Sequence, residues 1–464
     1  MTTAVGPRIA IIGAGFSGSL LAVQLLKRVL PNGRVYLIEK NAQFGGGLAY
    51  STGNAHHLLN VRASRMSAFV DEPDHFTNWL RRRDNSQPAI TAPKSVDTFV
   101  PRQLYGAYIQ DLLGNEIWQS GRGRNLHLVP DEATAIEQTQ DKLVVEVGTG
   151  RRYEVDGAVL AVGNFPNEDA TRHYYGNPWD ARATADLDAN AAVLLIGTGL
   201  TMVDSVISLL DSGHRGGIYA VSRRGLLPRR HGDAPSHSPA WLSDADVGSV
   251  TDLLRAVRRE VRESDDETVW RSVVDSLRPY TQQLWQGLSP DERRRSLRHL
   301  RPWWDVHRHR MAPSVADIIE RAVQRGQLSL LAGRMLQMKP DDQGVDVTLS
   351  RRGFDSPPQL RVARVIDCSG PQCDYESISS PLVRSLLDGG VARPDPLRLG
   401  LDVTVDSAVI DRDGNPSQRL YALGPVTRGI FWEITSVPDI REQCWKVASQ
   451  IGLRLTAPQM ARAS

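Results

Sequence analysis

The stretch RIAIIGAGFSGSLLAVQLL, residues 8–26, is the strongest indication of the fold in this chain. Its apolar, β-branched beginning predicts a buried strand, and its amphipathic end predicts a helix. Between the two, Gly13, Gly15 and Gly18 have the spacing GxGxxG. The first glycine permits a tight turn, the second lets a pyrophosphate approach the backbone, and the third lets helix and strand pack closely. The free N–H groups at the start of the helix would face the phosphates, so the sequence predicts a Rossmann-like dinucleotide-binding unit here.

An acidic residue follows the next predicted strand, which covers residues 35–38. Glu39 stands where a carboxylate can accept hydrogen bonds from the adenosine ribose, and its charge would repel a 2′-phosphate. We therefore expect FAD at this first site. NAD is the alternative ligand, but a second nucleotide unit further along the chain favours flavin for the first.

That second unit begins with VLLIGTGLTMVDSVISLL, another strand-glycine-helix pattern. Gly197 and Gly199 repeat the first two glycines, but Met202 takes the place of the third, which predicts looser packing of the helix on its strand. Arg223 and Arg224 stand where an acid would hold a ribose hydroxyl, and two guanidinium groups can bind a 2′-phosphate. The pattern predicts an NAD(P)H site and favours NADPH over NADH; the alternative is an ordinary solvated basic turn.

Length and composition are those of a globular protein with more than one domain. The chain has 464 residues, of which 41% are hydrophobic and 23% charged. A formal net charge of +2 gives no reason to expect a nucleic-acid or membrane partner. We find no signal peptide, no apolar run long enough to span a bilayer and no CxxC among the three cysteines, so we expect a cytoplasmic protein. We expect no metal, because nothing completes a site around His307 and His309.

The order of the predicted elements indicates an α/β fold with two Rossmann-like dinucleotide-binding domains, one for FAD and one for NAD(P). We assign residues 1–165 and 330–464 to a discontinuous FAD-binding domain and residues 190–330 to the NAD(P)-binding domain. Residues 244–325 are rich in Arg and Trp, and their pattern predicts a helical segment inserted in the second domain.

Segments over nearly the whole chain resemble a known family. They are GAGFSGSLLA, GGGLAYS, HHLLNVRASRMSAF, PRQLYGAY, VLAVGNFP, GTGLTMVD, RPWWDVHRHRMAP, VIDCSGP and GPVTRGIFWEITSVPDIR. In these segments the chain resembles the bacterial FAD/NAD(P)-binding flavoproteins with two dinucleotide-binding domains, which share the plan of flavin monooxygenases and N-hydroxylases.

The resemblance implies which residues lie near the cofactors. VLAVGNFP and VIDCSGP would both return to the FAD domain, and Arg428 and Gly429 would lie near the flavin, with the helix from Pro438 directing its N-terminus at the ring. Pro425 replaces an Asp that often holds the ribityl chain, which leaves that contact open. The expected cofactor-binding residues are Gly13, Gly15, Ser17, Gly18, Glu39, Lys40, Gly47, Asn60, Met66, Gly163, Gly197, Gly199, Arg223, Arg224, Gly370, Gly424 and Trp432.

The resemblance also implies an activity. Within this group, the assigned activity that fits this sequence is that of the FAD-dependent urate hydroxylases. The implied reaction consumes NAD(P)H and O2 and hydroxylates a small anionic heterocycle through a flavin hydroperoxide; we expect the conversion of urate to 5-hydroxyisourate. The alternatives are an NAD(P)H:acceptor reductase or oxidase without oxygen insertion, an N-hydroxylating monooxygenase, and a flavin-binding sensor without turnover. Because CxxC is absent, a dithiol reductase is not expected.

An anionic substrate would need a cation and a dry, flat pocket over the flavin. We assign catalytic roles to His307, Arg310 and Arg428. Trp303 and Trp304 are more often core anchors than substrate platforms, and His307 and His309 can simply cap a helix or pair with nearby carboxylates. Further candidate cations or stacking platforms are Arg62, Arg65, Trp303, Trp304 and Trp432.

Overall fold

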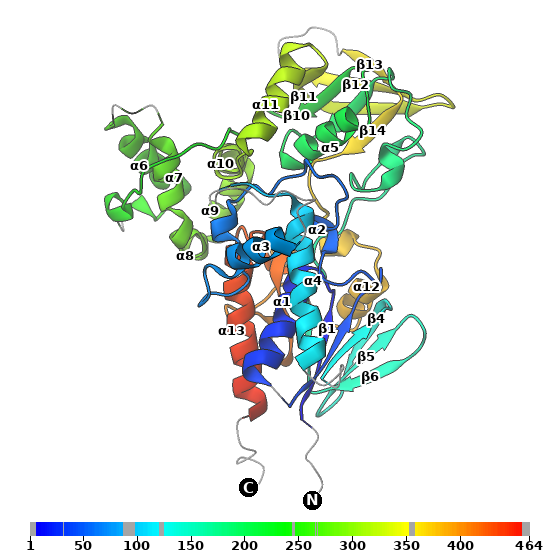
Figure 1. Ribbon diagram of the computed structural model, residues 1–464, viewed down its shortest axis with the longest axis vertical. Helices are drawn as coiled ribbons and strands as arrows, with labels where there is room; N and C mark the ends of the chain where they lie inside the picture. The colour runs from blue at the N-terminus through cyan, green and yellow to red at the C-terminus, as the bar shows by residue number, and fades with distance from the viewer. Residues whose placement is uncertain are drawn as a thin grey trace, which may run out of the picture. The chain divides into compact units, whose positions relative to one another are not determined.

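The chain folds into two compact units (Figure 1). The first comprises Met1–Ala55, Val61–Phe165 and Gln372–Ser464, and the second comprises His56–Asn60 and Pro166–Pro371. The computed structural model describes residues 6–30, 32–86, 98–119, 125–243, 246–264, 266, 268–351 and 358–456. In this part of the chain, no helix is both long and apolar enough to cross a membrane.

A six-stranded sheet forms the centre of the first unit, in the order β15-β16-β7-β1-β2-β3. All neighbouring pairs are parallel except β15 with β16. The strands are β1 (Arg8–Ile12), β2 (Arg34–Ile38), β3 (Leu126–Val129), β7 (Gly157–Leu160), β15 (Ala408–Ile410) and β16 (Pro416–Ala422). The apolar β1 is central because helices and a second sheet cover both of its faces, so that Ile9 to Ile12 are all buried.

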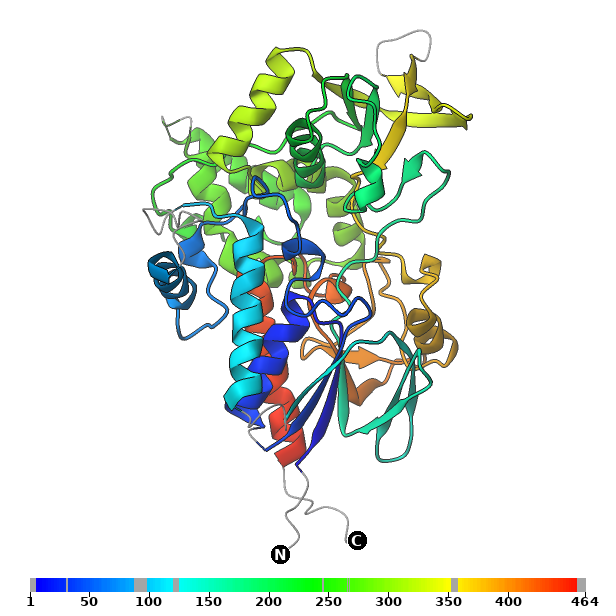
Figure 2. The same ribbon diagram turned by 45° about the vertical axis from the view of Figure 1, so that its right-hand side comes forward.

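Three helices run side by side within this unit, as both views show (Figures 1 and 2). They are α1 (Phe16–Gln24), α4 (Arg102–Gln119) and α13 (Val437–Thr456). Every residue of α1 is buried, because α4 and α13 pack against it on one side and the sheet lies on the other. The shorter helices α2 (Gly47–Tyr50) and α3 (His75–Ser86) also belong to this unit.

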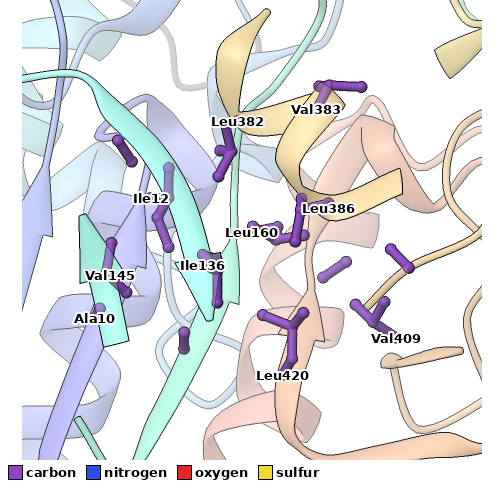
Figure 3. Packing of buried hydrophobic residues seen from close by; sticks show 14 of the residues in the cluster. Ala10, Ile12, Ile136, Val145, Leu160, Leu382, Val383, Leu386, Val409 and Leu420 are labelled. Atoms are coloured by element: carbon purple, nitrogen blue, oxygen red, sulfur yellow. The ribbon is translucent and has the colours of Figure 1, made fainter. Parts of the chain in front are cut away.

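The hydrophobic core of the first unit fills the opposite face of the sheet (Figure 3). Successive side chains of β1 point to opposite faces of the sheet. Ala10 and Ile12 therefore face this core, whereas Ile11 faces α1. A three-stranded antiparallel sheet and one helix cover the core. They are β4 (Ala133–Gln138), β5 (Leu143–Val147), β6 (Arg152–Val155) and α12 (Pro381–Asp388).

A seven-stranded sheet forms the centre of the second unit, in the order β13-β12-β11-β10-β9-β14-β8. The strands are β8 (Tyr174–Tyr175), β9 (Val193–Ile196), β10 (Ile218–Ser222), β11 (Leu328–Pro340), β12 (Val345–Arg351), β13 (Gln359–Val362) and β14 (Arg364–Asp367). The first half of β11 pairs parallel with β10, and its second half pairs antiparallel with β12. Helix α5 (Leu200–Asp211) connects β9 to β10, and helix α11 (Pro313–Gln324) directly precedes β11.

The predicted Arg/Trp-rich segment is helical and belongs to the second unit. Its helices are α6 (Val250–Arg262), α7 (Trp270–Ser276), α8 (Thr281–Gly287), α9 (Pro290–Arg295) and α10 (Arg301–Arg308). Helix α6 starts at a Ser249 cap whose side chain accepts the N–H of Asp252, the polar start that helices favour.

The chain returns to the first unit later than the sequence indicated. The expected return was at residue 330 and the observed one is at Gln372, because β11 to β13 extend the second sheet and β14 pairs with β9. The segment VIDCSGP, expected to return to the FAD domain, therefore lies in the second unit with Gly370. Asn60, expected in the FAD domain, lies in the short stretch His56–Asn60 that groups with the second unit.

Candidate functional site

The first glycine turn lies at the carboxyl end of β1. Gly13 has a φ of +100°, and a Cβ there would overlap the carbonyl of Ala161, so only glycine fits. A Cβ on Gly18 would overlap the carbonyl of Gly13. Gly15 precedes α1 as its N-cap and has no side chain that could occupy the N–H groups at the start of the helix. This arrangement has the geometry that a pyrophosphate needs, and binding of a pyrophosphate here remains a prediction from the sequence.

A second loop of the same unit covers this turn. A Cβ on Gly47, which has a φ of +53°, would come within 2.8 Å of the Cα of Gly15. The two glycines therefore bring two backbone segments into close contact at the helix start. Both were predicted cofactor residues, and the structure brings them together.

Glu39 is fixed at the end of β2 by the turn itself. Its Oε2 accepts the N–H of Ala14 at 2.8 Å, and its Oε1 accepts the N–H of Asn41 at 3.2 Å. Each carboxylate oxygen keeps a further lone pair for a ribose hydroxyl. Glu39 and the exposed Lys40 line a cavity of about 80 Å³ beside Gly13.

A buried polar network lies where the first glycine turn meets the C-terminal segment. Gly424, at a φ of +77°, donates its N–H to Oε1 of Gln443 at 2.9 Å, and a Cβ there would come within 2.8 Å of Oγ of Ser17. The amide nitrogen of Gln443 donates to Thr427 and Ser407, each at 3.1 Å. The sequence predicted Ser17 and Gly424 but missed Gln443, because a glutamine within a helix carries no positional signal.

Apart from Asn60 and Gly370, which lie in the second unit, the other residues predicted near the flavin are in the first unit. Gly163 has a φ of +68° with open space beside it, whereas Met66 is buried. Gly429 packs against the side chain of Asp395 too closely to admit a Cβ. Half-buried Arg428 donates to Sγ of Cys373 at 3.3 Å. Arg62, Arg65 and Trp432 also lie in this unit, with Arg65 exposed.

The second glycine turn lies at the carboxyl end of β9. Gly197, at a φ of +105°, donates its N–H to Val221 at 2.7 Å, and a Cβ there would overlap the carbonyl of Cys368. Gly199 is the N-cap of α5, and a Cβ on it would meet no other atom within 4 Å. Met202 is completely buried, so the third position is filled by a packed side chain.

Four arginines line one open pocket of about 750 Å³ beside this turn. Arg223 and Arg224 follow β10, Arg301 begins α10, and Arg334 lies on β11. Arg301 pairs with Asp305 at 3.4 Å, whereas Arg223, Arg224 and Arg334 form no ion pair with any described residue. Sequence reasoning missed Arg334, whose position follows from the parallel pairing of Ser222 with Ala332.

Two of the predicted catalytic residues lie in the helical segment and already have partners. Arg310 is 2% exposed, and its guanidinium forms a two-point ion pair with Asp275 at 2.8 and 3.1 Å. Burial lowers the pKa of Arg310, an effect that the Asp275 carboxylate opposes. Nδ1 of His307 lies 2.8 Å from the carbonyl oxygen of Trp303, and burial lowers the pKa of His307. The third, Arg428, lies in the other unit.

Comparison with known proteins supports the nucleotide-binding fold. Residues 10–165 match the family described as FAD-NAD(P)-binding. The uncharacterized protein YdhS of Escherichia coli K12 is 22% identical over 311 residues, a match that covers 58% of this chain and 57% of YdhS. The chain thus aligns with little more than half the length of this curated relative.

Similar solved structures span almost the whole chain. The reduced ornithine hydroxylase PvdA of Pseudomonas aeruginosa is superimposed with a TM-score of 0.64 at 13% identity, covering 97% of this chain and 100% of PvdA. The FAD-bound cadaverine monooxygenase DfoA of Erwinia amylovora also gives 0.64 at 13% identity, covering 98% and 95%. The chain therefore has the α/β fold of flavin monooxygenases, as predicted. The description of the family that matches residues 10–165 agrees with the FAD and NAD(P)H predicted from the two glycine turns.

Proposed function

We propose that this chain is an FAD-containing monooxygenase that uses NADPH and O2 to hydroxylate the amino group of a small amine. The observation that carries the proposal is the pair of glycine turns with opposite charges at the ribose position. Glu39 stands at the first turn, and Arg223 and Arg224 stand at the second. An acid suits an unphosphorylated ribose, whereas guanidinium groups suit a 2′-phosphate.

The first unit supplies the flavin site in this proposal. The N-terminus of α1 and the backbone of Gly13 to Gly15 hold the pyrophosphate, and Glu39 holds the ribose. The Gln443 network fixes Gly424 beside Ser17 at the flavin end. The bound flavin would supply the redox chemistry and the activation of O2.

The second unit supplies the reductant site. Gly197 and Gly199 leave room for the pyrophosphate at the start of α5. The exposed guanidinium groups of Arg223 and Arg224, with Arg334 beside them, hold the 2′-phosphate, which is the reason we favour NADPH over NADH.

An amine is better supported as substrate than urate. PvdA is an ornithine hydroxylase and DfoA a cadaverine monooxygenase, and both align with almost the whole chain. Urate hydroxylation would also need a cation to bind the anionic ring. The guanidinium of Arg310, which we expected in that role, instead donates two hydrogen bonds to the carboxylate of Asp275. Urate hydroxylation thus has no support from these comparisons, and N-hydroxylation, the alternative considered from the sequence, replaces it as our proposal.

The cysteines do not favour disulfide reduction. Burial raises the pKa of Cys368 to about 12 and also raises that of Cys444. A thiol with a raised pKa is a poor nucleophile at neutral pH, and Cys373 alone cannot form an intramolecular dithiol.

Product analysis tests the proposal. Purified flavoprotein would be mixed in air with NADPH and, separately, with ornithine, lysine, cadaverine or urate. We expect one amine to accelerate NADPH oxidation and to yield its hydroxylamine in proportion to the NADPH consumed. Hydrogen peroxide as the sole product with every amine would instead favour an oxidase, and consumption of urate would restore the urate hypothesis.

A further inference from the structure

A further cavity lies within the helical segment. All of its lining residues fall between Val250 and His307 and so belong to neither glycine turn. It has a volume of about 620 Å³ and is lined by residues of α6, α7, α9, α10 and the short helical segment Ser296–Leu300 before α10. Pockets for small organic ligands have volumes of about 300 to 1,000 Å³, so this cavity is large enough for one.

The walls of the cavity are apolar and aromatic. Leu254, Val257 and Val261 recur along one face of α6 and remain only partly buried. Trp303 and Trp304 of α10 face the same space, and Trp303 is 44% exposed. An apolar ligand that covered these side chains would gain about 25 cal/mol for each Å² of apolar surface removed from water.

The rim of the cavity is basic. Arg258 and Arg262 lie one turn apart on α6, and both are exposed. Neither forms an ion pair with any residue that the structure describes, and none of the described residues lining the cavity is acidic. Arg255 on the same helix does not line the cavity and is paired with Asp252 at 3.0 Å. The unpaired arginines of α6 are thus those at the cavity.

Helix α10 separates this cavity from the second nucleotide pocket. Arg301, Pro302, Asp305 and Val306 line the nucleotide pocket, whereas Trp303, Trp304 and His307 line the cavity. The spacing of three and four residues in each set places the sets on opposite faces of the helix. The guanidinium group of Arg224, which lines the nucleotide pocket, lies over the ring of Trp303, with 5.5 Å between the guanidinium carbon and the ring centre. The cavity is therefore separate from the nucleotide pocket. It adjoins the part of that pocket where we place the 2′-phosphate.

We propose that this cavity binds a small organic carboxylate with an aromatic or aliphatic body. The body packs between α6 and the two tryptophans, and the carboxylate is held by Arg258 and Arg262. Guanidinium groups bind carboxylates through two parallel hydrogen bonds, and the rings of tryptophan stack on flat apolar groups. This inference goes beyond the proposed function and does not depend on it.

Calorimetric titration of the full-length, FAD-loaded protein with 1-naphthylacetate tests the proposal. The neutral 1-naphthylacetamide, of nearly the same shape, serves as the control ligand. We expect the acid to bind at least about tenfold more tightly than the amide, because only the acid can pair with both arginines. The double variant Arg258→Gln/Arg262→Gln should remove this difference, and the matched Arg255→Gln should keep it.

Two further results distinguish this proposal from its competitors. Leu254→Glu, which places a negative charge in the cavity wall from a partly exposed position, should abolish binding of the acid without loss of FAD or helix content. Equal binding of acid and amide, or no binding of either, would overturn the proposal. A dimer of the wild-type protein that Leu254→Glu dissociates would overturn it as well, because a second copy would then cover the cavity.

Discussion

The two glycine turns of this chain differ in how far each is covered by its own unit. At the first turn, Gly47 packs on Gly15, so that a Cβ on Gly47 would come within 2.8 Å of the Cα of Gly15. At the second turn, a Cβ on Gly199 would meet no other atom within 4 Å. A covered turn suits a resident cofactor that stays bound, whereas an open turn suits a reductant that exchanges in every cycle. The same local motif thus supports two different roles through its surroundings.

The third glycine position shows a related difference. A side chain at Gly18 would strike the carbonyl of Gly13, so the first turn requires glycine there. The second unit accommodates Met202, which is completely buried. Helix α5 therefore packs through a side chain where α1 packs through its backbone.

The largest expected effect is that of Gly18→Ala. The added methyl group would overlap the carbonyl of Gly13, so α1 would have to move away from the turn, and we expect the variant to purify without FAD. The ratio of flavin to protein absorbance measures the loss. Gly199→Ala is the matched control at the open turn and should stay yellow; a yellow Gly18→Ala would break the comparison.

A large but purely structural effect is expected in the second unit from Asp275→Asn. This change leaves the buried guanidinium of Arg310 without its charged partner, and because the Asp275 side chain is 40% exposed, the cost should be about 1 to 3 kcal/mol of unfolding free energy. Chemical denaturation would measure the loss, with Asp291→Asn, an exposed carboxylate of the same segment, as control. If Arg310 acts on substrate and not on folding, Asp275→Asn will instead leave stability unchanged and reduce turnover.

An intermediate effect is expected from the double variant Arg223→Gln/Arg224→Gln. Loss of both charged contacts to a 2′-phosphate should raise KM for NADPH at least about tenfold and leave KM for NADH nearly unchanged. Steady-state oxidation of both nucleotides measures the preference. Arg215→Gln, at the other end of β10, is the control. An equal rise for both nucleotides would mean that the arginines do not select NADPH.

The smallest expected effect is that of Glu39→Gln. The amide keeps an acceptor for the N–H of Ala14 and for the ribose but loses the charge, so the affinity for FAD should fall by about tenfold. Reconstitution of apoprotein with FAD, followed by fluorescence, measures the affinity, with the exposed Glu137→Gln as control. An unchanged affinity would show that Glu39 only stabilises the turn.

The sequence predicted those features that short motifs determine. Both glycine turns, Glu39 and Arg223 with Arg224 follow from local spacing, because strand, turn and helix are adjacent in the chain. The return of the chain at Gln372 could not be predicted, since it depends on the pairing of β14 with β9 over a long sequence separation. Residues contributed by distant elements, such as Arg334 and Gln443, escaped for the same reason.

The case of Arg310 shows the limit of assigning roles by residue type. An arginine in a Trp-rich segment suggested a ligand for an anionic substrate. Its actual surroundings are Asp275, the carbonyl of His307 and the ring of Trp270, all within the helical segment. Only the fold reveals that this guanidinium is already neutralised.

Anaerobic mixing of the purified protein with NADPH tests whether the chain binds FAD and takes electrons from NADPH. We expect a yellow protein whose flavin absorbance is bleached by NADPH, and a yellow Arg223→Gln/Arg224→Gln variant that requires a higher NADPH concentration for the same bleaching. A protein that stays colourless after incubation with excess FAD, or a yellow protein that NADPH does not reduce, would contradict this expectation.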